Sequence, residues 1–228
     1  MLQKFKRHLS KSFPALKDQK ILLALSGGLD SCVLLDLCLK SGLQPAVAHC
    51  NFKLRGKDSD DDAKWIKNLA NTKNLKYYIE NFHTKSYARA KKVSIQMAAR
   101  DLRYEWFDQL LNELSFDFIL VAHHTNDALE TFMINAMRGT GLRGLLGIPE
   151  RRGKFLRPML PFSRVDIMQY AQKNNIKWRE DSSNAETYYL RNALRHEVIP
   201  LWKKIDPNFD KQFQETLKYL GRAQAVLD

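Results

Sequence analysis

The chain has 228 residues, enough to bury the core of one large domain or of one domain with an appendage. Its 37 Lys and Arg against 25 Asp and Glu give a formal net charge of +12, which favours a polyanionic partner such as nucleic acid, although solubility alone also produces a positive surplus. No apolar run reaches the roughly 18 residues of a membrane span, and the basic start lacks the pattern of a secretory signal, so we expect a cytoplasmic protein without a membrane partner.

The first elements lead up to a glycine-rich loop. Residues 2–17 carry apolar side chains spaced for one helix face. Residues 21–25 form an apolar run without polar alternation, which is typical of a strand buried on both faces. This strand breaks at residues 26–28 into a Ser-Gly-Gly turn, and a helical pattern follows Asp30. The order strand, glycine turn, helix therefore opens the chain's main domain.

Such a turn forms an anion site, because the first N–H groups of the helix have no partner within it and the helix dipole favours negative charge there. The loop reads Ser26-Gly27-Gly28-Leu29-Asp30-Ser31, and Asp30 would repel phosphate unless a cation such as Mg2+ lies between them. The loop lacks the lysine of a P-loop and does not match G-x-G-x-x-G. It resembles the pyrophosphate loop (PP-loop) of N-type ATP pyrophosphatases, which split ATP between the α and β phosphates. A plain strand-to-helix turn is the alternative.

Further strands and helices alternate along the chain. Strands are predicted at residues 45–50, 76–80 and 116–122. Helices are predicted from a cap at Asp58 and Ser59, over residues 94–114, and after the polar residues at 123–127. This alternation predicts an α/β fold with a doubly wound parallel sheet. Ligands bind beyond the carboxyl ends of such strands, so the polar groups after the first, second and fourth strands should meet in one crevice.

The polar residues after the fourth strand allow more than one interpretation. Asp127 and Glu130 lie three apart at a helix start and share a face. They would hold a second Mg2+, receive a substrate ammonium, or simply cap the helix. Adjacent His123 and His124 cannot both face one ion from a regular element, so we expect no transition-metal site.

The last part of the chain is basic and helical. Residues 139–144 match G-x-G-x-x-G but follow a helix, so we predict a flexible loop, where Arg138 and Arg143 either touch phosphates or form a solvated basic surface. A helix capped by Ser163, a polar turn at 178–184, a helix at 190–199 and an amphipathic helix at 209–227 are expected to follow. The last helix stops without a cap, so the chain looks cut.

Taken together, these motifs resemble the tRNA(Ile)-lysidine synthetases over nearly the whole chain up to about residue 200. The segments that carry the resemblance are Ser26 to Ser31, His49 to Gly56, Ala99 to Tyr104, Ala122 to Thr131, Arg138 to Gly144 and Trp178 to Asn184, with Arg191, Asn192 and Arg195. The family often has histidine at position 52, so no catalytic role is assigned to Phe52. Family members usually carry further domains, which implies a catalytic domain at 1–200 and, at 201–228, a helical linker or the start of a C-terminal region.

The resemblance implies a ligase with ATP and Mg2+ as cofactors. The O2 atom of the wobble cytidine, C34, of an isoleucine tRNA with a CAU anticodon attacks the α-phosphate of ATP, and pyrophosphate leaves. The ε-amine of free L-lysine then displaces AMP to give lysidine. Which carboxylate accepts the amine's proton stays open, and a homodimer is one option for assembly.

The resemblance also implies roles for individual residues. The loop residues Ser26, Gly27, Gly28, Leu29, Asp30 and Ser31 would hold the phosphates, with Asp30 as the Mg2+ ligand and with Ala24 and His49 beside the adenosine. Asp127 and Glu130 would bind the lysine ammonium or a metal, and Arg100 and Arg103 a phosphate or the lysine carboxylate. Asp30, Asp127, Glu130 and Arg100 are therefore the expected catalytic residues. Residues expected near lysine or tRNA are Asn51, Arg55, Arg103, His123, Arg138, Arg143, Asp181, Arg191 and Arg195.

Three other functions compete with this one. A tRNA thiolation enzyme needs reactive cysteines, but Cys32 and Cys38 lie six apart, about 240° around one helix, and Cys50 stands alone, a pattern that fits packing in a reducing compartment. An amide ligase such as an NAD or GMP synthetase would not need the basic surplus. A non-catalytic tRNA-binding module would not need the intact loop at 26–31.

Overall fold

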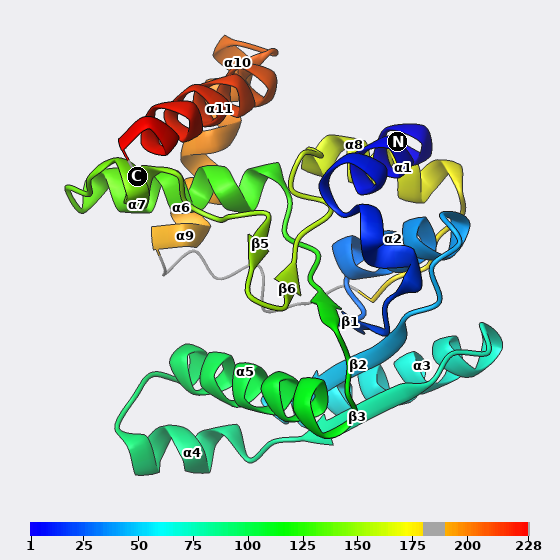
Figure 1. The fold of residues 1–228 in the computed structure, drawn as a ribbon. Coiled ribbons are helices and arrows are strands. Elements are labelled where there is room, and N and C mark those ends of the chain that lie inside the picture. The colour runs from blue at the N-terminus through cyan, green and yellow to red at the C-terminus, as the bar shows by residue number, and fades with distance from the viewer. Residues whose placement is uncertain (180–189, 228) are drawn as a thin grey trace.

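The computed structural model describes residues 1–179 and 190–227. Within them, one six-stranded sheet has the order β3-β2-β1-β4-β6-β5, and only the edge pair β5–β6 is antiparallel (Figure 1). The predicted doubly wound α/β fold is confirmed. The strands are β1 (Ile21–Ala24), β2 (Ala46–Asn51), β3 (Tyr77–Asn81), β4 (Phe118–Leu120), β5 (Arg151–Arg152) and β6 (Phe155–Leu156).

Helices follow most of the strands. They are α1 (Leu2–Ser12), α2 (Leu29–Lys40), α3 (Lys57–Thr72), α4 (Thr84–Lys91), α5 (Ile95–Glu113), α6 (Thr125–Met137), α7 (Leu142–Leu145), α8 (Arg164–Lys173), α9 (Leu190–Ala193), α10 (Ile199–Ile205) and α11 (Phe209–Leu227). A 3-10 turn (Pro14–Asp18) follows α1, and a π-helical turn (Leu194–Val198) joins α9 to α10. None of the helices in the described ranges is long and apolar enough to cross a membrane.

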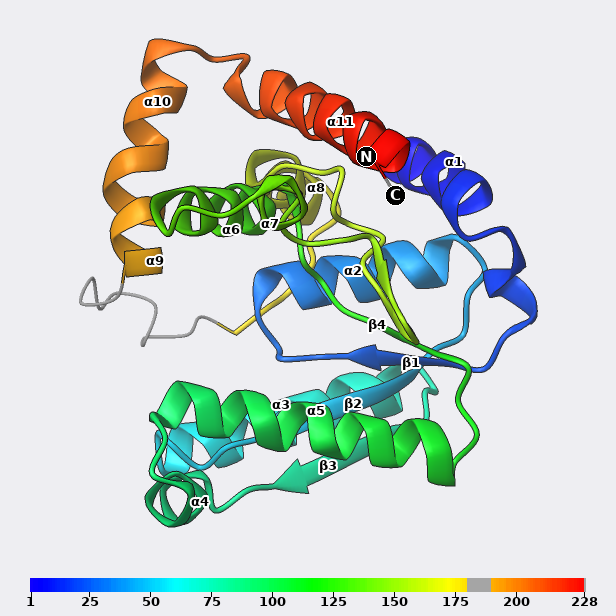
Figure 2. The same ribbon diagram turned by 60° about the vertical axis from the view of Figure 1, so that its left-hand side comes forward.

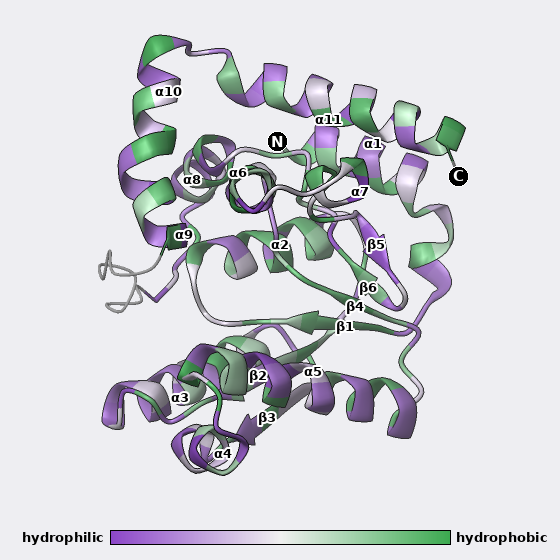
Figure 3. Ribbon diagram, turned by 90° about the vertical axis from the view of Figure 1, so that its left-hand side faces the viewer, coloured by the Kyte–Doolittle hydropathy of each residue, from purple (hydrophilic) through white to green (hydrophobic). Residues whose placement is uncertain are grey.

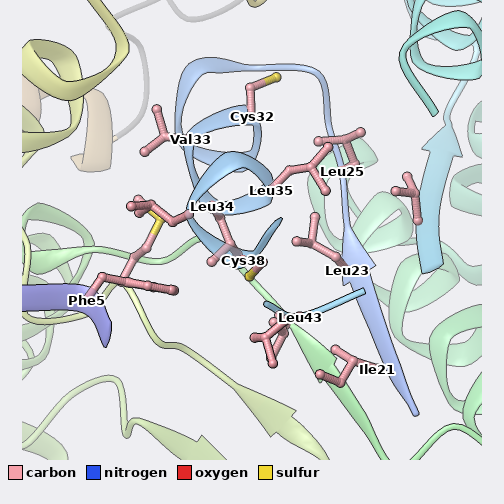
Figure 4. Close-up of a cluster of buried hydrophobic side chains, with 14 of the residues drawn as sticks. Phe5, Ile21, Leu23, Leu25, Cys32, Val33, Leu34, Leu35, Cys38 and Leu43 are labelled. Carbon is pink, nitrogen blue, oxygen red and sulfur yellow. The ribbon is translucent and has the colours of Figure 1, made fainter. Parts of the chain in front are cut away.

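The central strand β1 is buried on both faces, as its unbroken apolar run predicts. Leu23 and Leu25 point to one face, where Leu35 and Cys38 of α2 cover them (Figure 4). Leu22 points to the other face and packs in a second cluster formed with α5. Because alternate strand residues face opposite sides, one short strand anchors helices on both faces of the sheet (Figure 2).

Five details differ from the sequence-based expectation. The first helix ends at residue 12, because the chain turns into the 3-10 segment at Pro14, which lacks a backbone donor. Helix α3 begins at Lys57 with Gly56 as N-cap, so Asp58 and Ser59 lie inside its first turn rather than capping it. Part of the expected loop at 139–144 is the short helix α7. Helix α4 was not expected. The β5–β6 hairpin was not expected either, since two-residue strands show no alternation and β5 is hydrophilic (Figure 3).

The C-terminal helices pack together in a separate small core. Leu129 and Met133 of α6 contact Leu194, Ile199 and Phe213, so α6 bridges the main sheet and the helices that follow residue 190. Helix α11 lies along α6 and α7 (Figure 1). This packing holds the described residues after 189 near the carboxyl ends of the sheet strands, where α6 begins.

Candidate active site

The loop at residues 26–31 is held by its own hydroxyl groups. Ser26 Oγ lies 3.1 Å from Ser31 Oγ and accepts a hydrogen bond from the Gly28 N–H at 3.3 Å. Gly28 is the N-cap of α2 without a side-chain cap, which leaves N–H groups of the first turn available to a ligand. Gly27 has φ +89°, a backbone angle that residues with a Cβ rarely adopt, so glycine suits this position. The loop is thus preformed for an anion.

A cavity of about 240 Å3 opens beside this loop, at the carboxyl ends of β1, β2 and β4. Four of the residues expected at ATP line it: Ala24, Ser26, Asp30 and Ser31. Tyr104 and Phe107 of α5 form an apolar wall suited to a base. The predicted meeting of polar groups in one crevice therefore holds for the first and fourth strands, and β2 contributes Ala48 and Cys50 rather than the His49 side chain.

The buried ring of His49 has another function in the fold. Its Nδ1 lies 2.9 Å from the Leu25 carbonyl oxygen, and burial lowers the pKa of His49. The ring lies on the opposite face of β2 from its neighbours Ala48 and Cys50 because side chains alternate along a strand. His49 thus fixes β2 to the end of β1 directly beneath the loop.

Asp30 is surrounded by positive and titratable groups. Arg164 Nη1 donates a hydrogen bond to Asp30 Oδ1, and His124 Nε2 lies 3.7 Å from the same oxygen. The Arg164 backbone N–H donates to Asn126 Oδ1 at 3.1 Å, which fixes the start of α8. Sequence reasoning missed Arg164, because nothing local to residue 164 indicates a partner at residue 30.

The donor set at this position fits Mg2+. A carboxylate at Asp30 and hydroxyl groups at Ser26 and Ser31 face one cavity, and Mg2+ prefers such oxygen ligands together with substrate phosphates. Over the described ranges, no group of three or more His, Cys, Asp and Glu side chains could hold a metal ion by itself. Mg2+ at Asp30 would therefore depend on phosphate oxygens and would compete with Arg164 for the carboxylate.

A second charged group lies on α6. Glu130 is fully buried, and its oxygens accept hydrogen bonds from Arg195 Nε at 2.7 Å and Nη2 at 2.9 Å. Arg195 Nη2 also lies 3.4 Å from Asp127, and Arg191 Nε 3.6 Å from Glu130. Burial lowers the pKa of Arg195, but the hydrogen bonds and charges of Glu130 and Asp127 outweigh it and raise the pKa overall. The structure thus brings together four of the predicted residues as two carboxylates and two guanidinium groups.

Asp127 also caps its helix. Its Oδ2 accepts the His124 backbone N–H at 2.9 Å, which completes a capping box at the start of α6. Because Oδ2 is engaged in this way, Oδ1 is the oxygen that points to Arg195. Capping and binding of a cationic group are therefore compatible at this residue.

His123 acts as a hydrogen-bond acceptor in the cavity wall. Its Nδ1 accepts from Arg157 Nε at 3.2 Å. Burial, with a smaller contribution from the charge of Arg157, lowers the pKa of His123 to about 4 against the opposing effect of Asp127. The ring is thus neutral near pH 7. No local sequence pattern indicates this contact between residues 123 and 157.

Asn51 and Arg55 stabilise the segment after β2 and do not line the cavity. Asn51 Nδ2 donates to Asp60 at 2.8 Å and to Asn81 at 2.9 Å. Arg55 Nη2 pairs with buried Asp62 at 2.6 Å. Arg179 Nε pairs with the same carboxylate at 2.7 Å.

Arg179 also reaches the loop. Its backbone N–H donates to the Gly27 carbonyl oxygen at 2.9 Å. The segment after α8 therefore supports the loop from outside, a link between residues far apart in sequence that no local pattern indicates.

The remaining predicted arginines lie in different places. Arg103 lines the cavity beside the loop, with its guanidinium 5.2 Å from the Phe52 ring centroid. Arg100, one turn earlier, lies over Tyr104 at 4.9 Å and lines a second cavity. Arg138 is exposed at the end of α6, and Arg143 is exposed within α7. Asp181, with the turn at 180–184, lies outside the described residues.

The cysteines are poorly suited to sulfur transfer. Burial raises the pKa of Cys32 to about 12 and that of Cys50, which lines the cavity, also to about 12. Burial raises the pKa of Cys38 as well. A thiolate is the nucleophilic form, so these environments favour packing.

A family profile described as a PP-loop domain matches residues 1–202. The chain is 41% identical to a tRNA(Ile)-lysidine synthase of Bacteroides thetaiotaomicron, over 98% of this chain and 53% of the relative. It is 42% identical to that of Porphyromonas gingivalis W83, over 89% and 45%, and 35% identical to that of Chlorobaculum tepidum, over 99% and 69%. The chain thus spans about half the length of the first two relatives.

Among solved structures, the fold is similar to that of the U34-tRNA thiolase NcsA from Methanococcus maripaludis with its 4Fe-4S cluster. The TM-score is 0.77 at 17% identity, over 96% of this chain and 78% of that one. The fold is also similar to that of an NH3-dependent NAD synthetase from Campylobacter jejuni, with a TM-score of 0.55 at 18% identity, over 96% and 92%. At these identities the similarity concerns the fold alone.

Proposed function

Since the chain belongs to the PP-loop family and, within it, to the tRNA(Ile)-lysidine synthases, we propose that it ligates L-lysine to C2 of the wobble cytidine, C34, of an isoleucine tRNA with a CAU anticodon. The cytidine O2 attacks the α-phosphate of ATP and pyrophosphate leaves. The lysine ε-amine then displaces AMP, giving lysidine, AMP and pyrophosphate. The observation that carries the proposal is the cavity lined by Ser26, Asp30 and Ser31 of the PP-loop, together with 41% identity to a lysidine synthase over 98% of the chain.

In the first step, the loop would hold the leaving pyrophosphate. The first N–H groups of α2 and the hydroxyls of Ser26 and Ser31 face the cavity where the phosphates would lie. Asp30 would hold Mg2+, which neutralises the charge that develops on the phosphates when it is bound. Arg103 and Arg164 supply positive charge at opposite sides of this region.

In the second step, the group of Asp127, Glu130, Arg191 and Arg195 would receive lysine. An ammonium would pair with Asp127 Oδ1, which Arg195 holds at the longer distance of 3.4 Å, while the guanidinium groups would bind the amino acid's carboxylate. Attack needs the free amine, so a nearby carboxylate accepts its proton. We further propose that residues 1–200 form the catalytic domain, which the family match over residues 1–202 supports, and that residues 201–228 form a helical linker or the start of a C-terminal region.

The test measures pyrophosphate release from ATP and Mg2+ with a transcribed CAU-anticodon isoleucine tRNA, with and without labelled lysine. We expect label in the tRNA, lost on changing C34 and on Asp30→Ala. The matched control is Asp36→Ala, on the same helix, whose carboxylate pairs with Lys40 and Tyr170 instead of facing the cavity. Pyrophosphate release without label would refute lysine as the acceptor, and absence of both activities in this chain would refute the proposal for residues 1–228.

A further inference from the structure

A second cavity, of about 500 Å3, lies between α5 and the β5–β6 hairpin. Lys154 precedes β6 at the amino end of the sheet, and Arg157 follows it at the carboxyl end. Asn112 and Arg100 mark the corresponding ends of the α5 wall. The cavity therefore extends along the sheet edge, and we call it the edge groove.

Positive charge dominates the edge groove. Its lining includes the cations Arg100, Arg152, Lys154 and Arg157 but a single carboxylate, Asp108. Within residues 1–179 and 190–227, none of Arg100, Arg152 and Lys154 has a salt-bridge partner. Burial lowers the pKa of Arg157, and the charges of Arg152 and Arg100 lower it further, against the opposing effect of Tyr104. These cations thus repel one another and would be stabilised by an anion.

Aromatic side chains accompany the cations. The Tyr104 and Phe155 rings lie 5.0 Å apart in the wall, and the Arg100 guanidinium lies over Tyr104. Cations beside aromatic side chains suit a nucleotide strand, whose phosphates and bases contact these two kinds of group. A volume of about 500 Å3 accommodates more than a single small anion.

The edge groove reaches the cavity beside the PP-loop at Tyr104, which lines both. A base that reacts at the α-phosphate must enter that cavity, while its neighbours in the strand stay outside. Arg100 and Arg157 lie at the end of the groove nearest to the reacting position, and Arg152 and Lys154 lie further along it.

We propose that the edge groove binds the phosphodiester backbone of the RNA nucleotides that flank the target cytidine. The inference rests on the proposed function and gives it a path for the strand. Arg152 and Lys154 contact phosphates, and Tyr104 separates the strand in the groove from the nucleotide in the cavity beside the PP-loop.

The test compares Arg152→Ala, and Arg152→Ala with Lys154→Ala, against the control Arg151→Ala. Arg151 is the neighbouring residue of the same strand, so this variant loses the same charge. Arg151 is not part of the groove lining: its guanidinium lies over the Phe118 ring at 5.2 Å, and its Nε donates to the Gly153 carbonyl oxygen at 3.2 Å. Binding of the CAU-anticodon tRNA to the full chain is measured by fluorescence anisotropy over a salt series. Binding of ATP and of inorganic pyrophosphate is measured by calorimetry.

We expect the dissociation constant for tRNA to rise on the order of fivefold for Arg152→Ala and more for the double variant. The slope of the logarithm of the binding constant against the logarithm of the salt concentration should fall in magnitude by about 1 for each lost phosphate contact. Arg151→Ala should change it less than twofold, and ATP and pyrophosphate binding should stay unchanged. Three results would overturn the inference. Arg151→Ala could weaken tRNA binding as much as Arg152→Ala does, the groove variants could lose pyrophosphate binding instead of tRNA binding, or the wild-type chain could fail to bind tRNA. Measuring lysine transfer to the tRNA separates the two proposals. If the groove variants weaken tRNA binding but the wild-type chain transfers no lysine, only the proposed function is refuted. If the chain transfers lysine and the groove variants transfer it equally well, only the role of the edge groove is refuted.

Discussion

Replacing Arg195 by alanine tests the charge group on α6 most directly. Glu130 is fully buried, and both of its carboxylate oxygens accept hydrogen bonds from the Arg195 guanidinium at 2.7 and 2.9 Å. Arg195→Ala would leave this buried charge with Arg191 Nε, at 3.6 Å, as a weaker partner. The variant should therefore unfold more easily, whatever its effect on lysine.

The size of the effect follows from the burial of the pair. Removing one partner of a buried ion pair costs roughly 3–5 kcal/mol. The Arg195 side chain is 38% exposed, so solvent screens part of the interaction and the lower end, about 3 kcal/mol, applies. For a chain of 228 residues, roughly 2–4 °C of Tm corresponds to each kcal/mol. Arg195→Ala should thus lower Tm by about 6–12 °C.

Thermal unfolding followed by circular dichroism at pH 7 measures this change. Arg222→Ala is the control, since it removes an arginine from α11 whose guanidinium lies over Tyr219. The double variant with Glu130→Gln should recover part of the loss, because it removes the unpaired charge together with its partner. A Tm for Arg195→Ala within about 2 °C of wild type, or a double variant as unstable as the sum of both changes, would refute the pairing argument.

Three further predictions follow from the cavity. Gly27→Ala should lower the free energy of unfolding by roughly 1–2 kcal/mol and weaken ATP binding. The control Gly42→Ala has a similar φ of +83° but open space around its Cβ, so it should lower stability alone. Calorimetry with ATP checks this, and equal ATP affinities of the two variants would contradict it. Arg164→Gln should lower the Mg2+ concentration needed for ATP binding by about two- to fivefold, because it removes a competitor at Asp30, and a higher requirement in a Mg2+ titration would contradict it. Burial holds the pKa of His123 at about 4, below its unfolded value, so the folded state should lose stability as pH falls from about 6.5 towards 4. Denaturant unfolding at several pH values should show a smaller loss of stability for His123→Asn than for wild type. Identical pH profiles of the two proteins would count against a buried, neutral His123.

Local patterns predicted most of the fold and the centre of the site. The run at 21–25, the turn at 26–28 and the helix after it interact with their own neighbours, so their structure is encoded over about ten residues. Side-chain direction was harder to predict. His49 faces away from the cavity because of its register in β2, a property of the assembled sheet.

The contacts of the site that the sequence did not predict join residues far apart in the chain. Arg164 reaches Asp30 across the fold, and Arg195 reaches Glu130 from the helices that follow residue 190. Neither arginine has a local pattern that names its partner, although the family resemblance placed Arg195 near lysine or tRNA. The β5–β6 hairpin, which forms one wall of the edge groove, has strands too short for any periodic signal.

The hydrogen bond from the Arg179 N–H to the Gly27 carbonyl has a consequence for how the protein is made. The loop leaves the ribosome early, but its support at residue 179, and the pairing of β1 with β4 at residues 118–120, come much later. Contacts of such long sequence separation form slowly. The loop of an early intermediate therefore lacks both of these supports. We expect ATP to stabilise the chain during synthesis only once these contacts have formed, after nearly the whole domain has been translated.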